Sequence, residues 1–290
     1  MVTSKKTDEP VERRGIETKI EHVYKPDRGF GFSDVQDLWQ YRDMFYFLVL
    51  RDIKVLYKQT VLGFGWAILR PVLGMVVFSV IFGRWAKIPS DGVPYPLFSF
   101  AALVPWTYFQ TAMTNSATSL VSGAQLVKKV YFPRVILPMV PVVSGLLDFV
   151  IAFSILLVLM VLYGVAPNGG LFAVPALILT MALFAAGTGL WLSALAVQYR
   201  DVKFGLPFVA QMLMYAAPVV WPASLIPERF RLLYGLYPMA GVIEGFRSAL
   251  LGTGPFPWDL VGVGAGFTAF LFITGLLVFR RLEQHAADVV

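Results

Sequence analysis

Six long apolar segments organise the chain between residues 61 and 279. They cover residues 61–83, 97–121, 135–163, 171–197, 204–221 and 260–279. A helix needs about 20 apolar residues to cross the hydrocarbon core of a bilayer. The segments are continuous runs rather than about ten-residue stretches of alternating hydrophobicity, so they predict helices and not the strands of a membrane barrel. The pattern predicts an all-α integral membrane protein with six transmembrane helices.

Two other segments have helical patterns that differ from a membrane span. In residues 34–60 apolar side chains recur at helical spacing, while Arg51, Lys54 and Lys58 fall together on another side. Such an amphipathic helix is expected to lie in the membrane interface; packing on a partner as a soluble helix is the alternative. Residues 222–254 are punctuated by proline and too polar to span, which predicts re-entrant helices between the fifth and sixth spans.

The remaining segments complete the expected domain organisation. Residues 1–33 mix charge, Pro and Gly without periodicity, and we expect a flexible cytosolic lead. The interface helix at 34–60 is followed by a six-span domain at 61–281. Residues 282–290 form a short cytosolic tail.

Lys and Arg are distributed unevenly between the two sides of these spans. Eighteen of the 24 basic residues lie in residues 1–60, in the loops at 122–137 and 198–204, or from Arg280 onward. Five lie in the segments on the opposite side. Because cytosolic loops are enriched in Lys and Arg, both termini are expected in the cytosol.

Composition excludes several classes of function. The chain is 57% hydrophobic and lacks cysteine, and its two histidines, His22 and His285, lie in the tails, so no thiol chemistry and no metal site are expected. Acidic residues in or near the spans are isolated, at Asp148, Glu244 and Asp259. A membrane glycosyltransferase or ligase would need a cluster of carboxylates or a metal site, which makes that class unfavourable. No basic segment is interleaved with aromatics in the manner of a nucleic-acid site.

A basic turn at residues 122–137 interrupts the apolar segments. Its distinctive side chains are Lys128, Lys129, Tyr131, Phe132 and Arg134. A basic loop between two spans obeys the positive-inside rule, and a stiff aromatic centre suits docking onto another protein. The turn is either a docking site or a topology signal without a partner.

Arg70 is the one basic residue inside a predicted span. It lies nine residues into that span, about 13 Å along a helix and near the middle of a roughly 30 Å core. An arginine there needs water, an anion or a carboxylate. Three readings stay open: attraction of an anionic substrate, a structural pair with Asp148 in the third span, and snorkelling toward the cytosol.

Aromatic residues are numerous enough to line a path for sugars, because their faces stack on the apolar faces of sugar rings. The candidates are Trp66, Trp106, Tyr108, Phe109, Tyr215 and Trp221. Membrane anchoring or helix packing is the alternative for each. The hydroxyl and amide side chains of the second span either pack against other helices or line a polar route. Glu244 and Arg247, three residues apart, either neutralise each other on a helix or also shape a pore mouth.

Five stretches of the sequence, in order, resemble the membrane subunit of ABC-2-type exporters of polysaccharides, O-antigen and teichoic acid. They are RDIKVLYKQTVLGFGWAILRP, VPYPLFSFAALVPWTYF, LVKKVYFPRVILP, YRDV at 199–202 and YPMAGVIEGFRSALLG. The resemblance runs from about Leu38 to Arg281 and leaves out the first 33 residues.

The resemblance implies a two-component exporter of the bacterial inner membrane. The permease would form a homodimer around a channel, the 122–137 region would dock on an ABC ATPase present in two copies, and the re-entrant helices would cap the outer side, with Glu244 and Arg247 as an outer gate. This chain has no G-x-x-x-x-G-K-[ST] phosphate loop, so ATP and Mg would be bound by the partner.

The same resemblance implies a polyprenyl-linked glycan as substrate, drawn from the cytosolic leaflet by Arg51, Lys54 and Lys58, with Arg70 further along the path. Teichoic acid, capsule, lipid or drug export on the same scaffold is the alternative. The particular glycan and its lipid anchor stay open.

Overall fold

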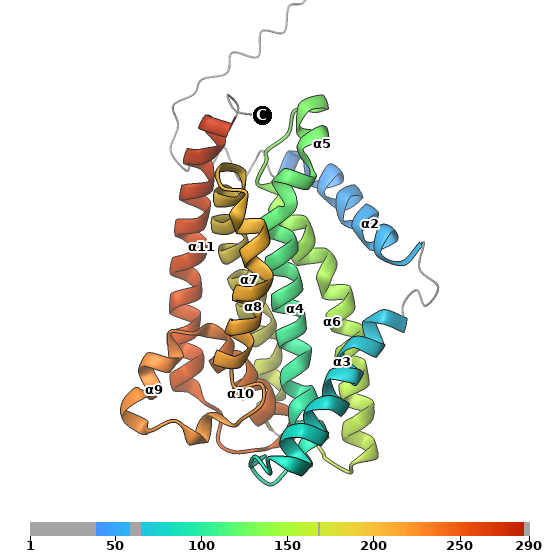
Figure 1. Ribbon diagram of the computed structural model, residues 1–290, viewed down its shortest axis with the longest axis vertical. Coiled ribbons are helices and arrows are strands. Elements are labelled where there is room, and N and C mark those ends of the chain that lie inside the picture. The colour runs from blue at the N-terminus through green and yellow to red at the C-terminus, as the bar shows by residue number, and fades with distance from the viewer. Residues whose placement is uncertain (1–38, 59–64, 168, 287–290) are drawn as a thin grey trace, which may run out of the picture.

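The computed structural model is an all-helical bundle whose longest helices run side by side (Figure 1). It describes residues 39–58, 65–167 and 169–286; the expected lead at 1–33 lies outside them. The long helices are α3 (Gly65–Phe78, continued by a π-helical segment, Ser79–Trp85), α4 (Tyr95–Ser122), α6 (Ile136–Leu162), α7 (Val174–Gln198, preceded by a 3-10 turn, Gly169–Ala173) and α11 (Trp258–Ala286). The predicted all-α class is confirmed.

Four of the described helical segments are long and apolar enough to cross a membrane. They are Gly65–Trp85, Ile136–Leu162, Gly169–Gln198 and Trp258–Arg281. The other two predicted spans correspond to α4, which has 28 residues but a lower apolar content, and to α8 (Asp201–Ala216), which has only 16 residues. The protein is therefore a multi-pass membrane protein by length and composition of its helices.

Helix α4 lies at the centre of the bundle and packs against α6, α7, α3, α10 and α8. Its buried residues number 18 of 28. Small residues bring the neighbouring helices close, as in other membrane bundles. A Cβ added to Gly187 of α7 would lie 2.9 Å from the backbone of Phe272 in α11, so only glycine fits at this crossing.

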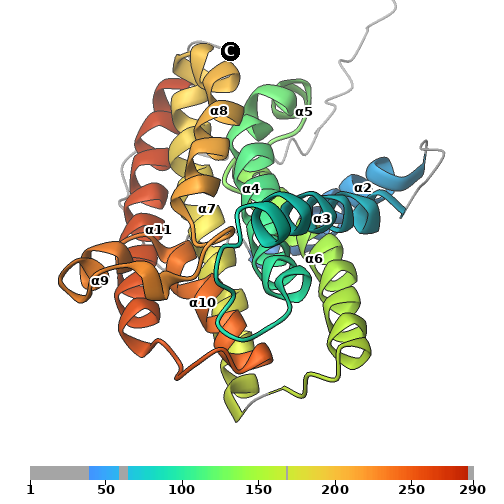
Figure 2. The ribbon, with the colours of Figure 1, turned by 60° about the horizontal axis from the view of Figure 1, so that its bottom comes forward.

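Two short helices follow α8, where re-entrant helices were predicted. They are α9 (Glu228–Gly235) and α10 (Pro238–Leu251), and both lie at the end of the bundle opposite α5 (Ala124–Lys129). Helix α10 is buried at 13 of its 14 residues and ends at Gly252, whose φ of +67° favours glycine. Figure 2 shows α9 projecting sideways from the bundle, whereas α10 sits against α7 and α11.

Helix α2 (Arg42–Lys58) crosses the α5 end of the bundle and packs on α6. Leu48 and Val49 are buried on its inner side, while Tyr46, Phe47 and Val55 are exposed. The described part of the predicted 34–60 helix is thus amphipathic and packs on its own chain. At the other terminus α11 continues to Ala286, so the expected tail at 282–290 begins as helix.

Candidate functional site

The basic turn forms a short helix, α5, followed by an extended stretch. Lys128 and Lys129 occupy the last turn of α5 and are exposed, and Val130 has extended backbone angles. Tyr131 is 77% exposed, whereas Phe132 is only 4% exposed. Successive side chains of an extended stretch point in opposite directions, which explains why neighbouring aromatics are separated in this way.

Phe132 is therefore not part of the exposed surface of the turn. Its ring is buried in an apolar cluster with Leu48 and Val49 of α2 and with the start of α6, and Leu126 of α5 packs against the same cluster. Burial in its own chain leaves no face of Phe132 for a partner. The exposed candidates are Lys128, Lys129 and Tyr131, and Arg134 is half-buried.

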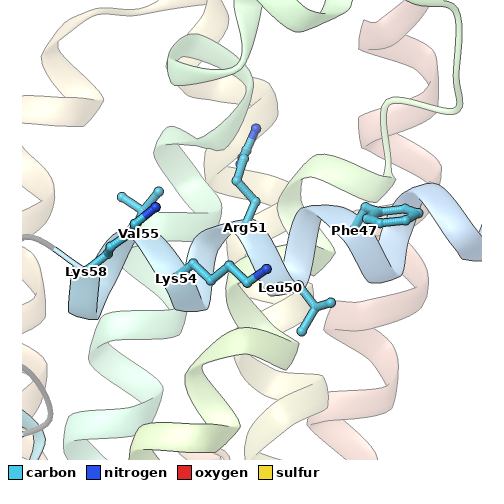
Figure 3. A pocket seen from close by; sticks show the side chains of 6 residues that line it. All are labelled: Phe47, Leu50, Arg51, Lys54, Val55 and Lys58. Atoms are coloured by element: carbon cyan, nitrogen blue, oxygen red, sulfur yellow. The ribbon is translucent and has the colours of Figure 1, made fainter.

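Three of the basic residues of the predicted interface helix, Arg51, Lys54 and Lys58, lie along an open cleft of about 450 Å³ on α2. The lining residues are Phe47, Leu50, Arg51, Lys54, Val55 and Lys58. They recur at three- and four-residue spacing and so form one stripe of the helix. In Figure 3 Lys54 extends along the helix toward Leu50, while Arg51 projects away from it. The arrangement combines cationic ends with apolar walls, which suits an amphiphilic anion.

Arg70 is exposed on α3, and its guanidinium carbon lies 5.9 Å from the ring centre of Trp66. No ion pair joins Arg70 to Asp148 among the described residues, which disfavours the structural pair as one of the three readings of Arg70. Arg70 lies five residues, about 7.5 Å, beyond the first described residue of α3. The aromatic neighbour and the exposure favour the other two readings of Arg70.

Three of the six aromatic candidates are buried core residues, which corrects their assignment to a sugar path. Trp106 donates a hydrogen bond to Gln110 (Nε1 to Oε1, 3.0 Å), and the Tyr108 hydroxyl donates to the Val142 carbonyl (2.9 Å). Phe109 stacks on Phe184 with ring centres 4.7 Å apart.

The other three aromatic candidates retain accessible surface. Trp66 and Tyr215 are exposed on α3 and α8. Trp221 is half-buried, and its ring centre lies 5.8 Å from that of Tyr234. Of the six candidates, Trp66 and Tyr215 are therefore the most accessible to a passing ligand.

A polar stripe runs along the part of α4 that the other helices leave uncovered. Its members are the half-exposed Thr107, Gln110, Thr111, Thr114 and Thr118 and the exposed Asn115. The serines of α4 differ, because Ser116 and Ser119 are buried, with Ser116 seated against Gly189 of α7. Of the two alternatives for the polar residues of α4, helix packing therefore applies to Ser116 and Ser119, whereas the threonines keep accessible surface.

At the α9–α10 end, the predicted gate residue Arg247 is completely buried. Its Nε donates to the Phe98 carbonyl (3.2 Å), Nη2 to the Val219 carbonyl (3.0 Å), and Nη1 to Glu244 Oε1 (2.9 Å) and the Trp221 carbonyl (3.4 Å). The guanidinium carbon also lies 3.4 Å from the centre of the Phe98 ring. Every nitrogen of the guanidinium thus donates at least one hydrogen bond, and a buried charge is tolerated only when it is paired and hydrogen-bonded in this way.

The same network fixes the turn after α8. Glu244 Oε1 accepts a hydrogen bond from the Ala223 backbone N–H (3.1 Å), and the Tyr95 hydroxyl donates to the Val220 carbonyl (2.7 Å). Glu244 and Arg247 thus neutralise each other and clamp this turn to α10 and α4. Within this chain they do not present charge at an open mouth.

A second ion pair lies at this end of the bundle and was not predicted from the sequence. Arg231 of α9 binds Asp259 in the first turn of α11 (Nη2 to Oδ1, 3.3 Å). The hydrogen bond to Asp259 is the main reason that the pKa of Arg231 is raised. The hydroxyls of Tyr234 and Tyr237 donate to the Ala216 and Leu213 carbonyls at the end of α8. No local spacing links these groups, so the sequence offers no signal for them.

The helical bundle, the polar stripe and the exposed basic turn fit a membrane permease, and comparison with known families identifies the class. The sequence model described as "ABC-2 type transporter" matches residues 44–251. The chain belongs to this family, as a transporter membrane subunit and not as an enzyme.

Among characterised proteins, the chain is similar to O-antigen export system permeases named RfbA. It is 30% identical to the Myxococcus xanthus protein over 259 residues, covering 88% of this chain and 98% of that protein. It is 25% identical to a Klebsiella pneumoniae protein over 249 residues, covering 86% and 95%. Similarity extends to the polysialic acid transport protein KpsM of Escherichia coli, at 23% identity over 244 residues, covering 82% and 92%.

Proposed function

We propose that this chain is the permease subunit of an ATP-driven exporter that moves lipid-linked, O-antigen-like polysaccharide from the cytosolic to the outer face of the bacterial inner membrane. The observation that carries the proposal is the polar stripe of α4 in a protein similar to O-antigen permeases. Gln110 accepts a hydrogen bond from Trp106, and Thr118 donates one to the Thr114 carbonyl. The remaining hydroxyl and amide groups of the stripe need water or sugar as hydrogen-bond partners, which a hydrated path supplies and lipid does not.

The proposed topology has six spans with both termini in the cytosol. Helices α4 and α8 supply the two spans that are less apolar or shorter than the rest. The 16 residues of α8 extend about 24 Å, which is about 6 Å less than the roughly 30 Å core. Helices α9 and α10 then dip into the outer leaflet. The buried clamp around Arg247 supports this placement, because irregular backbone at that depth must be satisfied by protein.

A second copy of the chain completes the channel in this proposal. Figures 1 and 2 show α4 between α8 and α3, and both of these helices contact it. Phe204, Phe208, Met212 and Tyr215 of α8 are exposed and recur at helical spacing beside the polar stripe. A homodimer that pairs these apolar borders would enclose the stripe, with Tyr215 and Trp66 available to stack on sugars.

In this proposal a partner ATPase docks at the opposite end of the bundle, on α5, and its ATP hydrolysis drives transport. We place the ATPase partner, in two copies per dimer, on the exposed surface made by Lys128, Lys129 and Tyr131, with Arg134 at its edge. The partner supplies the ATP and Mg sites, since the chain lacks a phosphate loop. Substrate would approach past Arg51, Lys54 and Lys58 on α2 and then Arg70.

The two-component proposal is tested by co-expressing this chain with the ABC ATPase encoded beside it and purifying either protein by a tag on the other. Recovery of a complex of two copies of each, in detergent and in nanodiscs, is the expected result. Failure to recover any complex in both environments would refute the proposal.

The path is tested with Thr111→Ile, which removes a hydroxyl from the stripe. Thr180→Ile is the matched control, because Thr180 is a half-exposed threonine of α7 outside the stripe and its hydroxyl bonds to the Ala176 carbonyl. We expect surface polysaccharide to fall in cells carrying Thr111→Ile and to persist with Thr180→Ile at equal permease levels. Equal export by the two variants would remove the stripe from the path.

Capsular polysaccharide is the second candidate cargo, because the KpsM relative is named for polysialic acid transport. Expression in strains lacking either an O-antigen permease or a capsule permease separates the two cargoes. Restored O-antigen without restored capsule is expected.

A further inference from the structure

The exposed face of α3 and its π-helical continuation changes from apolar to basic at the end of the bundle where α9 and α10 lie (Figure 1). Arg84 and Trp85 lie four residues beyond Val80 and Ile81, near one turn of this helix, and all four are exposed, Trp85 by 74%. The apolar face suits lipid chains, and an exposed basic and aromatic end suits lipid headgroups. Exposed apolar residues recur at three- and four-residue spacing before this end: Leu73, Val76, Val77, Val80 and Ile81.

The π-helical end of α3 is held firmly by its neighbours. Gly83 lies so close to the Tyr95 ring that an added Cβ would come within 2.8 Å of it. The Ile88 backbone N–H donates to the Phe82 carbonyl (2.9 Å), and both of these side chains pack against the main core. The basic residues at this end are therefore presented on a fixed backbone, and π-helical segments are frequent at functional sites.

Lys87 has a left-handed backbone, with a φ of +51°, that its sequence neighbours do not explain. It follows the end of the π-helical segment, at a position where glycine is usual. Among the described residues Asp91 is the other non-glycine residue with positive φ (+47°), but it precedes Gly92 in a turn closed by the Val93 N–H and the Ser90 carbonyl, and Asp-Gly is favoured in such turns. Strained backbone is retained where the side chain has a function, which points to the ammonium group of Lys87.

The two cations at this end are not neutralised by the protein itself. Neither Arg84 nor Lys87 forms an ion pair or a side-chain hydrogen bond within the described part of the chain. Asp91, the acid of the same loop, instead accepts a hydrogen bond from Ser224 in the turn after α8 (3.3 Å). Guanidinium and ammonium groups bind phosphate oxygens strongly, and an indole ring lies readily at headgroup level. The three exposed side chains thus match a phosphate at a membrane surface.

We propose that Arg84 and Lys87 bind the phosphate of a lipid headgroup in the outer leaflet, with Trp85 beside it and the lipid chain along Val80 and Ile81. The inference rests on the outward placement of this end in the proposed function. Arg84 lies 14 residues, about 20 Å, beyond Arg70, so this site is separate from the basic residues of the cytosolic side.

Two lipids carry this chemistry in the outer leaflet. One is a phospholipid such as phosphatidylglycerol, and the other is the polyprenyl diphosphate that the proposed function delivers there. A diphosphate offers more charge and more acceptor oxygens to the two cations, so we expect it to bind more tightly.

The test uses the full-length permease in phosphatidylcholine nanodiscs that contain increasing fractions of phosphatidylglycerol or of polyprenyl diphosphate, each with a photoreactive group near its head. Crosslinks are mapped by mass spectrometry of peptic peptides, and the lipid fraction for half-maximal crosslinking at the end of α3 gives the affinity. Tighter crosslinking of polyprenyl diphosphate is expected and would identify the delivered substrate as the occupant. Tighter crosslinking of phosphatidylglycerol would identify a resident phospholipid at the same phosphate site.

Variants separate a binding role from a structural one. Each basic residue near an anionic lipid contributes about fivefold in affinity, so Arg84→Gln with Lys87→Gly should weaken crosslinking roughly 25-fold. Lys87→Gly alone should weaken it about fivefold without lowering the melting temperature, because glycine adopts the left-handed backbone freely. Lys87→Arg should keep the affinity. Arg229→Gln is the matched control, because Arg229 is exposed on α9 at the same end of the bundle.

A labelling experiment distinguishes this inference from the proposed function. The chain has no cysteine, so Lys87→Cys introduces a single thiol. A membrane-impermeant maleimide should label it in intact cells whose outer membrane has been permeabilised, and labelling only after lysis would refute the proposed topology. With outside labelling established, crosslinks that avoid the end of α3, or an affinity unchanged in the double variant, would overturn the lipid phosphate site alone.

Discussion

Replacing Arg247 by methionine should cost a large part of the stability of this protein. Methionine keeps an unbranched side chain of moderate length but removes the guanidinium that bonds to Phe98, Val219, Trp221 and Glu244. Removing one partner of a buried ion pair costs about 3–5 kcal/mol, because the other charge is left buried and unpaired. Glu244 is 13% exposed in its side chain, so water replaces little of that loss. Typical native stabilities are about 5–15 kcal/mol.

The measurement is denaturant unfolding of the purified permease in detergent micelles, followed by tryptophan fluorescence. Arg229→Met is the matched control, because Arg229 is exposed on α9, and its effect should stay within about 0.5 kcal/mol. Adding Glu244→Gln to Arg247→Met should recover part of the stability, since no unpaired carboxylate remains. An Arg247→Met protein within about 1 kcal/mol of the control would refute the clamp; altered export with native stability would instead favour a gate.

Three further predictions concern packing and surface pairing. Gly187→Ala should lower the free energy of unfolding by about 1–3 kcal/mol, because the added Cβ would lie 2.9 Å from the Phe272 backbone. Gly205→Ala is the control, because the space around Gly205 is open, and it should leave the stability unchanged. Thermal unfolding of the two variants tests this difference. Phe109→Ala should cost about 3–5 kcal/mol and the exposed Phe208→Ala far less by the same unfolding assay, and equal losses would contradict the core assignment of Phe109. Arg231 and Asp259 form a partly exposed ion pair, so Arg231→Ala should lower the free energy of unfolding by at most about 1 kcal/mol. The double variant Arg231→Asp with Asp259→Arg, which exchanges the two residues, should restore the stability. A larger loss that the exchange does not restore would mean that Arg231 acts through another contact.

The helical class followed from the sequence because span length and the 3.6-residue period are local properties. Local patterns also predicted a helix within 34–60, where α2 spans Arg42–Lys58, and two short helices within 222–254, where α9 and α10 lie. Only four helices qualify as spans by length and apolar content. Helix α4 falls short because its threonine, serine and amide side chains lower its mean hydropathy.

The candidate site was harder to predict, because lipid and protein interior are both apolar. An aromatic on a membrane helix can face lipid, core or path, and the hydrophobic pattern is the same in each case. Trp106, Tyr108 and Phe109 therefore looked like path residues and proved to be core, while Thr111 and Thr114 keep accessible surface. The spacing of the threonines, four and three residues apart, was the available signal for the stripe.

By itself, the sequence determined that the chain is a helical membrane protein with a basic turn, no phosphate loop and no catalytic cluster, since these depend on composition and local order. Only the tertiary structure decided the roles of individual side chains. Phe132 is buried because α2, which precedes it by more than 70 residues in the sequence, covers its ring. Arg247 holds the turn in place because it donates a hydrogen bond to the carbonyl of Phe98, which lies 149 residues away in the sequence. Such partners are set by packing between distant segments, which no local pattern encodes.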